Sequence, residues 1–304
     1  MNSLLENFSK PILFILLGAF SLVYLRAWAR NMAAQVPSSK KPSILELTIG
    51  FITNFFDSLG IGSFAPTTSW FKIQKLVPDE HIPGTMHVGH SLPVIVQAFV
   101  FMTIIQVDML TLIALIAMAV AGAWLGARSI TRWPRNYIQI GLGLALGVAA
   151  ITFVMQLLGV ELVSNLTGNS LKLMGSKLYV GMAGTFVMGA LMTLGVGMYA
   201  PTMIMVSMLG MNPVVSFPIM MGSCAFLMPT ASIRFMHSNA YSLRPALGLA
   251  LGGIPGVLLG ALVIKEMPLD LMRWLVVVIV TYTSFAMLKS AYTERITDLS
   301  LIHI

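Results

Sequence analysis

The chain has 304 residues, of which 57% are hydrophobic and 10% charged, and its mean hydropathy is +0.87. This composition excludes an ordinary water-soluble globular protein and predicts a polytopic membrane protein. The net charge of +7 is carried by Lys and Arg residues in short loops between apolar stretches, which is typical of the positive-inside bias and not of a nucleic-acid-binding patch.

Seven apolar stretches are long enough to cross a bilayer, because about 20 apolar residues in a helix match about 30 Å of hydrocarbon. Their continuous hydrophobicity predicts helices, since the strands of a transmembrane barrel would alternate polar and apolar residues. The stretches are residues 11–29, 91–107, 109–127, 136–158, 216–235, 245–264 and 271–288.

Residues 1–29 are predicted to form an extra N-terminal transmembrane helix. A cleaved signal peptide is disfavoured, because Glu6 offsets Lys10 before the apolar run and two arginines follow it. We therefore expect a retained helix with its N-terminus outside the cell. The polar linker 30–42 is then cytoplasmic.

The next stretch contains the sequence GIGSFAPT at residues 60–67. Two glycines one residue apart unwind an apolar helix, and Pro66 can open a new one, because the first helical turn does not need its N–H. We predict a helix that ends at Leu59 and a second from Ala65 to about Leu76. The second piece, of about 12 residues and about 18 Å, is too short to cross the bilayer. This favours a re-entrant hairpin over two tilted full spans.

The same sequence returns as GVGMYAPT at residues 195–202, 135 positions later, with both glycines, the alanine, the proline and the threonine identical. At an offset of 134, Phe101-Met102 recurs as Phe235-Met236, and GxxxGA at 122–127 recurs at 256–261. An internal repeat dictates architecture. The sequence predicts a first transmembrane repeat at 43–158, an external linker at 159–177, a second repeat at 178–291 and a cytoplasmic tail at 292–304.

One hairpin and three spans return the chain to the opposite face, so the second repeat is predicted to be inverted. Charge supports this topology, since 13 of the 18 basic residues then lie on the cytoplasmic side: Arg26, Arg30, Lys40, Lys41, Lys72, Lys75, Arg128, Arg132, Arg135, Arg234, Arg244, Lys289 and Arg295. The predicted fold is an all-α polytopic membrane protein with two inverted repeats and broken or re-entrant helices, preceded by one extra N-terminal transmembrane helix. Such repeats are typical of secondary transporters.

Each new helix points unpaired N–H groups and its positive dipole end at the break, which favours an anion there. We predict a small anion between two opposed half-helix N-termini, with no cofactor and no metal. The predicted substrate-binding residues lie at the breaks or beside them: Gly60, Gly62, Ser63, Ala65, Thr67, Gly195, Gly197, Tyr199, Thr202, His90 and Ser91. Gln97, in the middle of its span, is a weaker candidate.

Asp57 lies three residues before Gly60 in an apolar helix, where a carboxylate is costly unless it is paired or used. It is predicted to couple a proton or a sodium ion to anion movement. The alternative is a structural carboxylate that caps the broken helix or bonds Ser58 and Asn54. The second repeat has Met192 at this place, and such asymmetry is expected of a coupling site.

His87 and His90 lie one helical turn apart. They have no nearby third ligand, and the lone Cys224 excludes a Cys-rich site, so a metal pair is disfavoured. A protonatable histidine beside the anion and simple helix packing both stay open. Arg234 either meets the anion or marks the cytoplasmic end of its helix.

The motifs LGIGSFAP from Leu59, LGVGMYAP from Leu194 and GxxxGAR ending at Arg128 resemble the TauE/SafE permeases, also called the 4-toluene sulfonate uptake permease family. The resemblance covers about residues 44–291. It implies transport of small sulfur-containing anions, such as sulfite, sulfoacetate or other sulfonates, across the bacterial cytoplasmic membrane. The family often has further glycines after its GxG, where this chain has Ser63-Phe64 and Met198-Tyr199. Because these residues are bulkier, the resemblance implies the class of the substrate and not the particular molecule.

Two other functions remain as alternatives. An anion channel would share the site but show flux that does not saturate. An integral membrane hydrolase or metal-dependent enzyme would use Asp57, His87 and His90, but no GxSxG or HExxH context accompanies them. The sequence therefore predicts a transporter and not an enzyme, with a small anion, a coupling ion and the lipid bilayer as partners.

Overall fold

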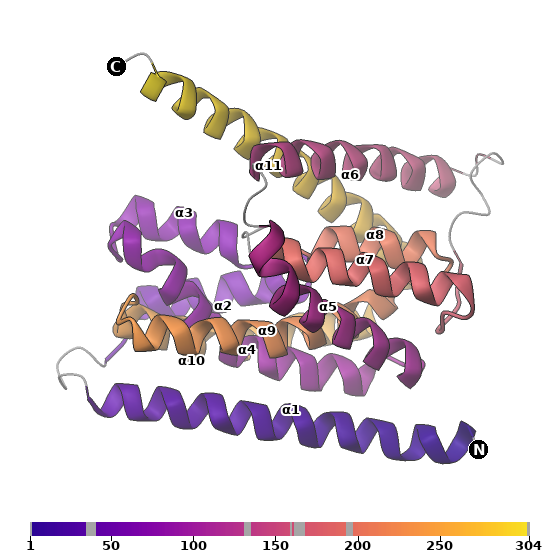
Figure 1. The fold of residues 1–304 in the computed structure, drawn as a ribbon, viewed down its shortest axis with the longest axis horizontal. Helices are drawn as coiled ribbons and strands as arrows, with labels where there is room; N and C mark the ends of the chain where they lie inside the picture. Colours follow the sequence, from indigo (N-terminus) through magenta and orange to yellow (C-terminus); the bar gives the residue numbers. More distant parts are fainter. Residues whose placement is uncertain are drawn as a thin grey trace. The chain divides into compact units, whose positions relative to one another are not determined.

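A computed structural model of the chain describes residues 2–34, 41–130, 135–158, 160, 168–192 and 197–302. Within these residues the elements are helices, and the only β pairing is an isolated bridge, so the predicted all-α class is confirmed. The elements are α1 (Asn2–Ala33), α2 (Ile44–Ser58), α3 (Phe64–Gln74), η2 (Asp79–His81), α4 (Ile82–Ile104), α5 (Met109–Ile130), α6 (Arg135–Leu157), α7 (Ser176–Met192), α8 (Tyr199–Met208), η4 (Pro213–Val215), α9 (Ser216–His237), α10 (Leu243–Glu266) and α11 (Leu269–Ile302) (Figure 1).

Each predicted span falls on one helix: α1, α4, α5, α6, α9, α10 or α11. Six described helices are long and apolar enough to cross a membrane, and the described apolar part of α5, Met109–Leu125, is shorter. The chain is therefore a multi-pass membrane protein. α11 runs on to Ile302, so the predicted tail continues the last helix instead of leaving it.

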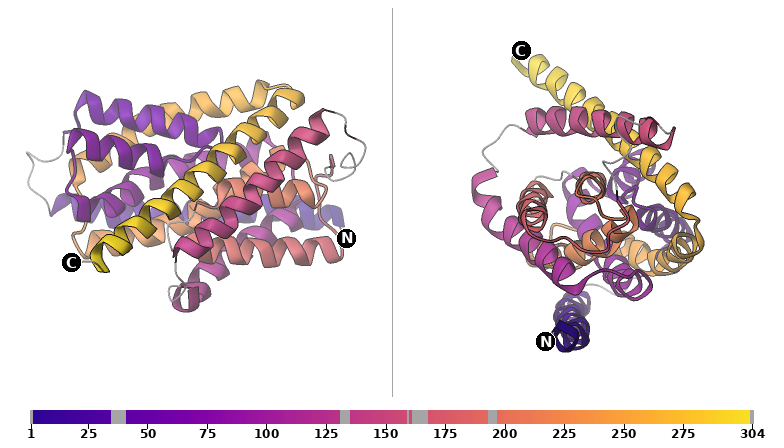
Figure 2. Two further views of the ribbon diagram at one scale, coloured as in Figure 1. Left: turned by 90° about the horizontal axis from the view of Figure 1, so that it is seen from above. Right: turned by 90° about the vertical axis from the view of Figure 1, so that its right-hand side faces the viewer.

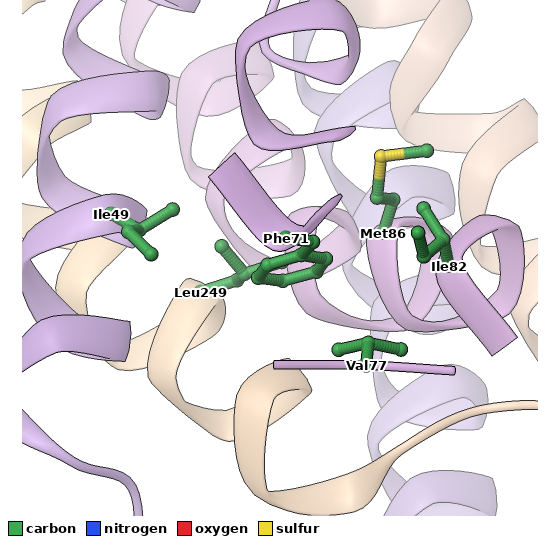
Figure 3. Packing of buried hydrophobic residues seen from close by; sticks show 6 residues of the cluster. All are labelled: Ile49, Phe71, Val77, Ile82, Met86 and Leu249. Atoms are coloured by element: carbon green, nitrogen blue, oxygen red, sulfur yellow. The ribbon is translucent and has the colours of Figure 1, made fainter. Parts of the chain in front are cut away.

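The first broken helix folds back on itself. Ile49, in the second turn of α2, and Phe71, near the end of α3, belong to one buried cluster with Val77, Ile82, Met86 and Leu249 (Figure 3). The start of α2 and the end of α3 therefore lie together, and the chain reverses at the glycines between them. With 15 and 11 residues the two helices are about 22 and 16 Å long, too short to span separately. This is the hairpin that the sequence favours.

The buried cluster also changes the interpretation of the loop after α3. From its polar residues, the sequence predicts a surface loop over residues 77–84. Val77 and Ile82 are only 5% and 3% exposed, because both side chains pack beside Phe71. Only the short helix η2 between them is polar and largely exposed.

The second broken helix folds back in the same way. Gly181 and Gly184 in the first half of α7 face Leu209 and Met205 at the end of α8. A Cβ atom added at Gly181 would lie 3.4 Å from Leu209 Cδ1. Both breaks therefore join two antiparallel helix pieces.

The chain divides into two compact units, residues 1–113 with 221–266 and residues 114–220 with 267–304. Each unit takes helices from both halves of the sequence. The first contains the hairpin α2–α3 with α4 and α10, and the second contains the hairpin α7–α8 with most of α5. In the second unit, α6 and α11 also lie along each other, where Ser284 Oγ donates to the Gly143 carbonyl at 2.6 Å (Figure 2). The repeat boundaries at 43–158 and 178–291 stay a prediction from the sequence.

Glycines bring α10 against α2 in the first unit. Gly248, Gly252, Gly256 and Gly260, four residues apart, face Glu46, Leu47, Phe51 and Ser58 in turn. Such small residues let the backbones of apolar helices approach closely. In the second unit, Gly122 of α5 faces the Phe186 carbonyl of α7, and Gly189 of α7 faces the Ala119 carbonyl of α5. The repeated GxxxG helix thus packs on a broken helix from the other half in both units.

We expect Gly252→Ala to destabilise the protein by about 1–3 kcal/mol, because its new Cβ would collide with the Leu47 backbone and force α10 away from α2. Gly18→Ala is the matched control, since an added Cβ at Gly18 meets no atom within 4 Å. Thermal unfolding in detergent measures both variants. Equal melting temperatures for the two variants would contradict the close packing.

Candidate functional site

The end of α2 is closed by its own backbone. Gly60 adopts φ +93°, its N–H donates to the Asp57 carbonyl at 2.9 Å, and the Ile61 N–H donates to the Phe56 carbonyl at 3.2 Å. This pair of bonds, with glycine in the left-handed position, is the Schellman motif, and it pairs carbonyls that the end of a helix leaves open. The structure therefore assigns the N–H of Gly60 to the helix cap, and the donors that face the break come from later residues.

The start of α3 has no such cap. Ser63 occupies the N-cap position with φ −90° and ψ −24°, and its side chain makes no capping hydrogen bond. The N–H groups of Gly62, Ser63, Phe64 and Ala65 have no acceptor among the described residues, and Pro66 has no N–H. Four donors and the positive end of the helix dipole are therefore left at the break.

Gly62 gives these donors room. Its φ of +90° belongs to the left-handed region, which glycine adopts without the steric cost that other residues meet. A Cβ added there would meet no atom within 4 Å. Backbone conformation, and not crowding, therefore requires this glycine, and the space beside it is open.

His90, fully buried on α4, is bonded at both ring nitrogens. Nδ1 lies 3.1 Å from Asn54 Oδ1, and Nε2 lies 3.1 Å from Thr67 Oγ1. Asn54 Nδ2 donates to the Gly50 carbonyl at 2.8 Å, so Oδ1 must be the acceptor that faces His90. Neutral His90 then carries its proton on Nδ1 and accepts from Thr67 at Nε2. This chain of side chains ties α2 and α4 to the first turn of α3.

Asp57 is buried in the last turn of α2 and bonds across to α4. Gln97 Nε2 donates to Asp57 Oδ2 at 2.9 Å and to Ser58 Oγ at 3.0 Å, while Ser58 Oγ donates to the Asn54 carbonyl at 3.0 Å. The Oε1 atom of Gln97 is buried without a hydrogen-bond partner in the described structure. Gln97, the weaker candidate from the sequence, thus contacts the predicted coupling carboxylate.

Ser91 and His87 lie on the next turns of α4. Ser91 Oγ donates to the His87 carbonyl at 2.7 Å and lies 2.8 Å from Ser232 Oγ of α9. His87 Nδ1 lies 2.8 Å from the Pro83 carbonyl, and the Phe64 ring packs 5.0 Å from the His87 ring and 5.9 Å from the His90 ring. Phe64 therefore covers both imidazoles from the start of α3.

The histidine pair lies outside any described cluster of metal-ligating side chains. Among the described residues no group of three or more His, Cys, Asp or Glu side chains could hold a metal ion. Arg234 is exposed in the last turn of α9, as expected for a residue that marks a helix end.

The start of α8 has the same local form as the start of α3. Met198 takes the N-cap position of α8 with φ −89° and ψ −8° and no side-chain cap, close to the values at Ser63. A Cβ added at Gly197 meets no atom within 4 Å, as at Gly62. Tyr199 begins the helix, and Thr202 Oγ1 is buried without a hydrogen-bond partner in the described part of the chain. Gly195 lies outside the described residues.

Most of the hydrogen-bonded polar side chains around the first break have no polar counterpart in the second copy. At the offset of 135 the positions of Asn54 and Asp57 hold Gly189 and Met192, and at the offset of 134 the positions of His90, Ser91 and Gln97 hold Cys224, Ala225 and Ala231. The sequence analysis identifies the missing polar side chain opposite Asp57 only. The same comparison of the two copies shows missing polar side chains opposite Asn54 and Gln97. Ser232 has no such signal, since its partner Ser91 lies 141 residues away.

Comparison with known protein families gives one match. The profile described as Sulfite exporter TauE/SafE matches residues 1–153, just over half of the chain. The match begins at the first helix, which the motif resemblance leaves out, and includes the first break. No curated protein and no solved structure matches the chain.

We expect Thr67→Val to destabilise the protein by about 1–3 kcal/mol, because it leaves Nε2 of the buried His90 without a donor. Thr202→Val, at the same place in the second copy, removes a hydroxyl with no partner and should leave stability unchanged or raised. Melting temperatures in detergent compare the two variants. A larger loss in Thr202→Val than in Thr67→Val would contradict the hydrogen bonding described here.

Proposed function

Because the chain belongs to the TauE/SafE sulfite exporter family, we propose that it is a secondary transporter that moves small sulfur-containing anions, such as sulfite or organosulfonates. The proteins of this family are transporters and not enzymes, so a hydrolytic or metal-dependent activity is set aside. The proposal extends to the cytoplasmic membrane as its location, with the N-terminus outside and the C-terminus in the cytoplasm. The excess of basic residues in the predicted cytoplasmic loops supports this orientation.

The observation that carries the proposal is the uncapped start of α3. The N–H groups of Gly62, Ser63, Phe64 and Ala65 make no hydrogen bond to another described residue, and the helix dipole adds positive potential there. A sulfite or sulfonate group offers several acceptor oxygens and a negative charge, which are the properties that bind at helix N-termini. Open space beside Gly62 supports access to these donors.

The N-terminus of α8 is proposed as a second anion contact. It repeats the N-cap geometry and the open glycine of the first break, and Thr202 adds a buried hydroxyl that is not used elsewhere. A hydroxyl in the first turn of a helix can donate to the same anion as the backbone N–H groups. The Thr67 hydroxyl, by contrast, is engaged by His90.

Asp57 is proposed as the coupling residue. It is a buried carboxylate one turn before the break, and the second copy has methionine at this place. An ionised carboxylate so close to the anion contact opposes anion binding, and a bound cation or proton relieves that repulsion. Exchange of the GxxxG helices between the two halves supports paired repeats, which are the architecture of alternating access.

In proteoliposomes, we expect saturable flux of sulfite or a small sulfonate that responds to an imposed pH or sodium gradient. Asp57→Asn should keep saturable binding and lose at least tenfold in gradient-driven flux, because an amide at this position can no longer bind and release a proton or a sodium ion. Asp108→Asn is the matched control, since Asp108 is a partly buried carboxylate that caps Thr111 at the start of α5.

Three other results would each contradict a different part of the proposal. Flux that does not saturate would indicate an anion channel. A response to the gradient that survives in Asp57→Asn would remove the role of this carboxylate. If no sulfur-containing anion moves under any gradient while the protein stays folded, the substrate class is wrong.

Ser63→Asp should abolish anion binding and transport. A carboxylate at the N-cap can accept from the open N–H groups of α3, and it then occupies the anion contact. Ser69→Asp, on an exposed face of the same helix, is the control for the added charge. Melting temperature checks that both variants fold, calorimetry measures anion binding, and tight anion binding by Ser63→Asp would disprove the site.

A further inference from the structure

Gln97 presents an unused acceptor beside a buried carboxylate. Its Nε2 is occupied twice, by Asp57 Oδ2 at 2.9 Å and by Ser58 Oγ at 3.0 Å. Its Oε1 has no partner among the described atoms, and the residue is fully buried. Buried polar atoms are nearly always paired, so an unpaired one needs an explanation.

A half-turn of the Gln97 amide exchanges two groups of nearly equal size. After the turn, Oε1 stands where Nε2 stood, at hydrogen-bond distance from Asp57 Oδ2 and Ser58 Oγ. The Ser58 hydroxyl, which donates to the Asn54 carbonyl in the first orientation, then rotates to donate to Oε1. In the first orientation the amide donates to a carboxylate, and in the second it accepts from a carboxylic acid. The same side chain can therefore satisfy Asp57 in both protonation states without repacking its neighbours.

We propose that Asp57 binds a proton as the coupling ion and that Gln97 is the positioning residue that accepts the hydrogen bond of the protonated carboxyl group through Oε1. A hydronium ion gives its proton to Asp57 Oδ2: one O–H bond of the hydronium ion breaks, one O–H bond forms on Oδ2, a water molecule is released, and the carboxyl group changes from −1 to neutral. This inference rests on the proposed anion transport and specifies its coupling ion.

One unused acceptor suits a proton better than a sodium ion. A sodium ion needs several oxygen ligands at once, whereas an O–H group needs one acceptor. Ser58 Oγ already donates to the Asn54 carbonyl, and Asn54 Oδ1 already accepts from His90. Gln97 Oε1 is therefore the acceptor that this cluster holds in reserve.

The other ionisable groups on the elements packed against Asp57 have separate roles. Glu46, at the start of α2, accepts from Arg244 of α10 at 3.0 Å. His90 of α4 uses both ring nitrogens, and His87 is bonded at Nδ1. The remaining charges lie at exposed helix ends, and they are Lys72 and Lys75 of α3 and Lys265 and Glu266 of α10. Of the two acidic side chains buried in the described structure, Asp57 is the one next to an unused acceptor.

Proton binding at Asp57 should favour anion binding. Neutralising the carboxylate removes a negative charge one turn from the open N–H groups of α3. By linkage, the anion must then increase the affinity for the proton by the same factor. Anion and proton are therefore expected to bind together.

Infrared difference spectroscopy of the purified protein without substrate tests the proposal. One component of the carboxylic acid C=O band should rise as pH falls and be removed by Asp57→Asn, while Glu46→Gln should leave that component unchanged. Replacing sodium by potassium at constant ionic strength should not move its midpoint. Gln97→Met should raise the midpoint by about one pH unit, because the charged form loses the stronger hydrogen bond, and should shift the band to higher frequency.

Gln97→Glu keeps the test valid if the methionine variant does not fold. Two carboxyl groups in contact should share one proton and titrate in two separated steps. A band that no variant at Gln97 moves, a midpoint that falls as sodium rises, or no band at all would each overturn the proposal. Because no substrate is present, a normal titration without any anion flux would instead overturn only the proposed function.

Discussion

The structure depends on how the backbone is satisfied at the first break. Irregular backbone inside a membrane protein must find partners for its N–H and C=O groups. The end of α2 meets this demand by itself, since Gly60 and Ile61 donate to the last carbonyls of the helix. The start of α3 does not, because Ser63 provides no cap and Pro66 has no N–H. The unpaired N–H donors are thus confined to the side of the break where α3 begins, and this is where the hairpin presents hydrogen-bond donors and the positive end of a helix dipole.

Close helix packing holds the polar side chains beside that break. Gly256 and Gly260 let α10 approach the last turns of α2, and Gly253 leaves room for the Asn54 amide and for Pro93 of α4. Asn54 is then fixed by the Gly50 carbonyl and can act only as an acceptor toward His90. The tautomer of His90 therefore follows from packing of α2, α4 and α10, because the same glycines that shorten the distance between helices also orient the amide.

Sequence periodicity and composition predict the helices and both breaks, because long apolar runs and a GxG before a proline leave few alternatives. They do not predict what each polar group does. The sequence places Gly60 with the anion, whereas its N–H closes α2, a distinction that depends on one φ angle. Gln97 contacts Asp57 from 40 residues further along the chain, and Val77 is buried although its loop is polar. Tertiary packing determines this contact and this burial, so local sequence does not predict them. A pattern that is local along the chain likewise cannot predict that α10 packs on α2 from the first half of the sequence and α5 on α7 from the second.

The two copies share the geometry of the helix start and differ in their buried polar side chains. Both keep an uncapped helix start and an open glycine, which are backbone properties and survive changes of side chain. Only the first keeps a carboxylate with its amide partner, because a second buried carboxylate would add the cost of another charge at membrane depth. Gly189 stands in the second copy where Asn54 stands in the first, and it packs on Ala119 of α5. A close contact between helices is therefore found there instead of a hydrogen-bonded amide. The geometry of the helix start is thus duplicated in the two copies, whereas the buried carboxylate with its amide partner belongs to the first copy.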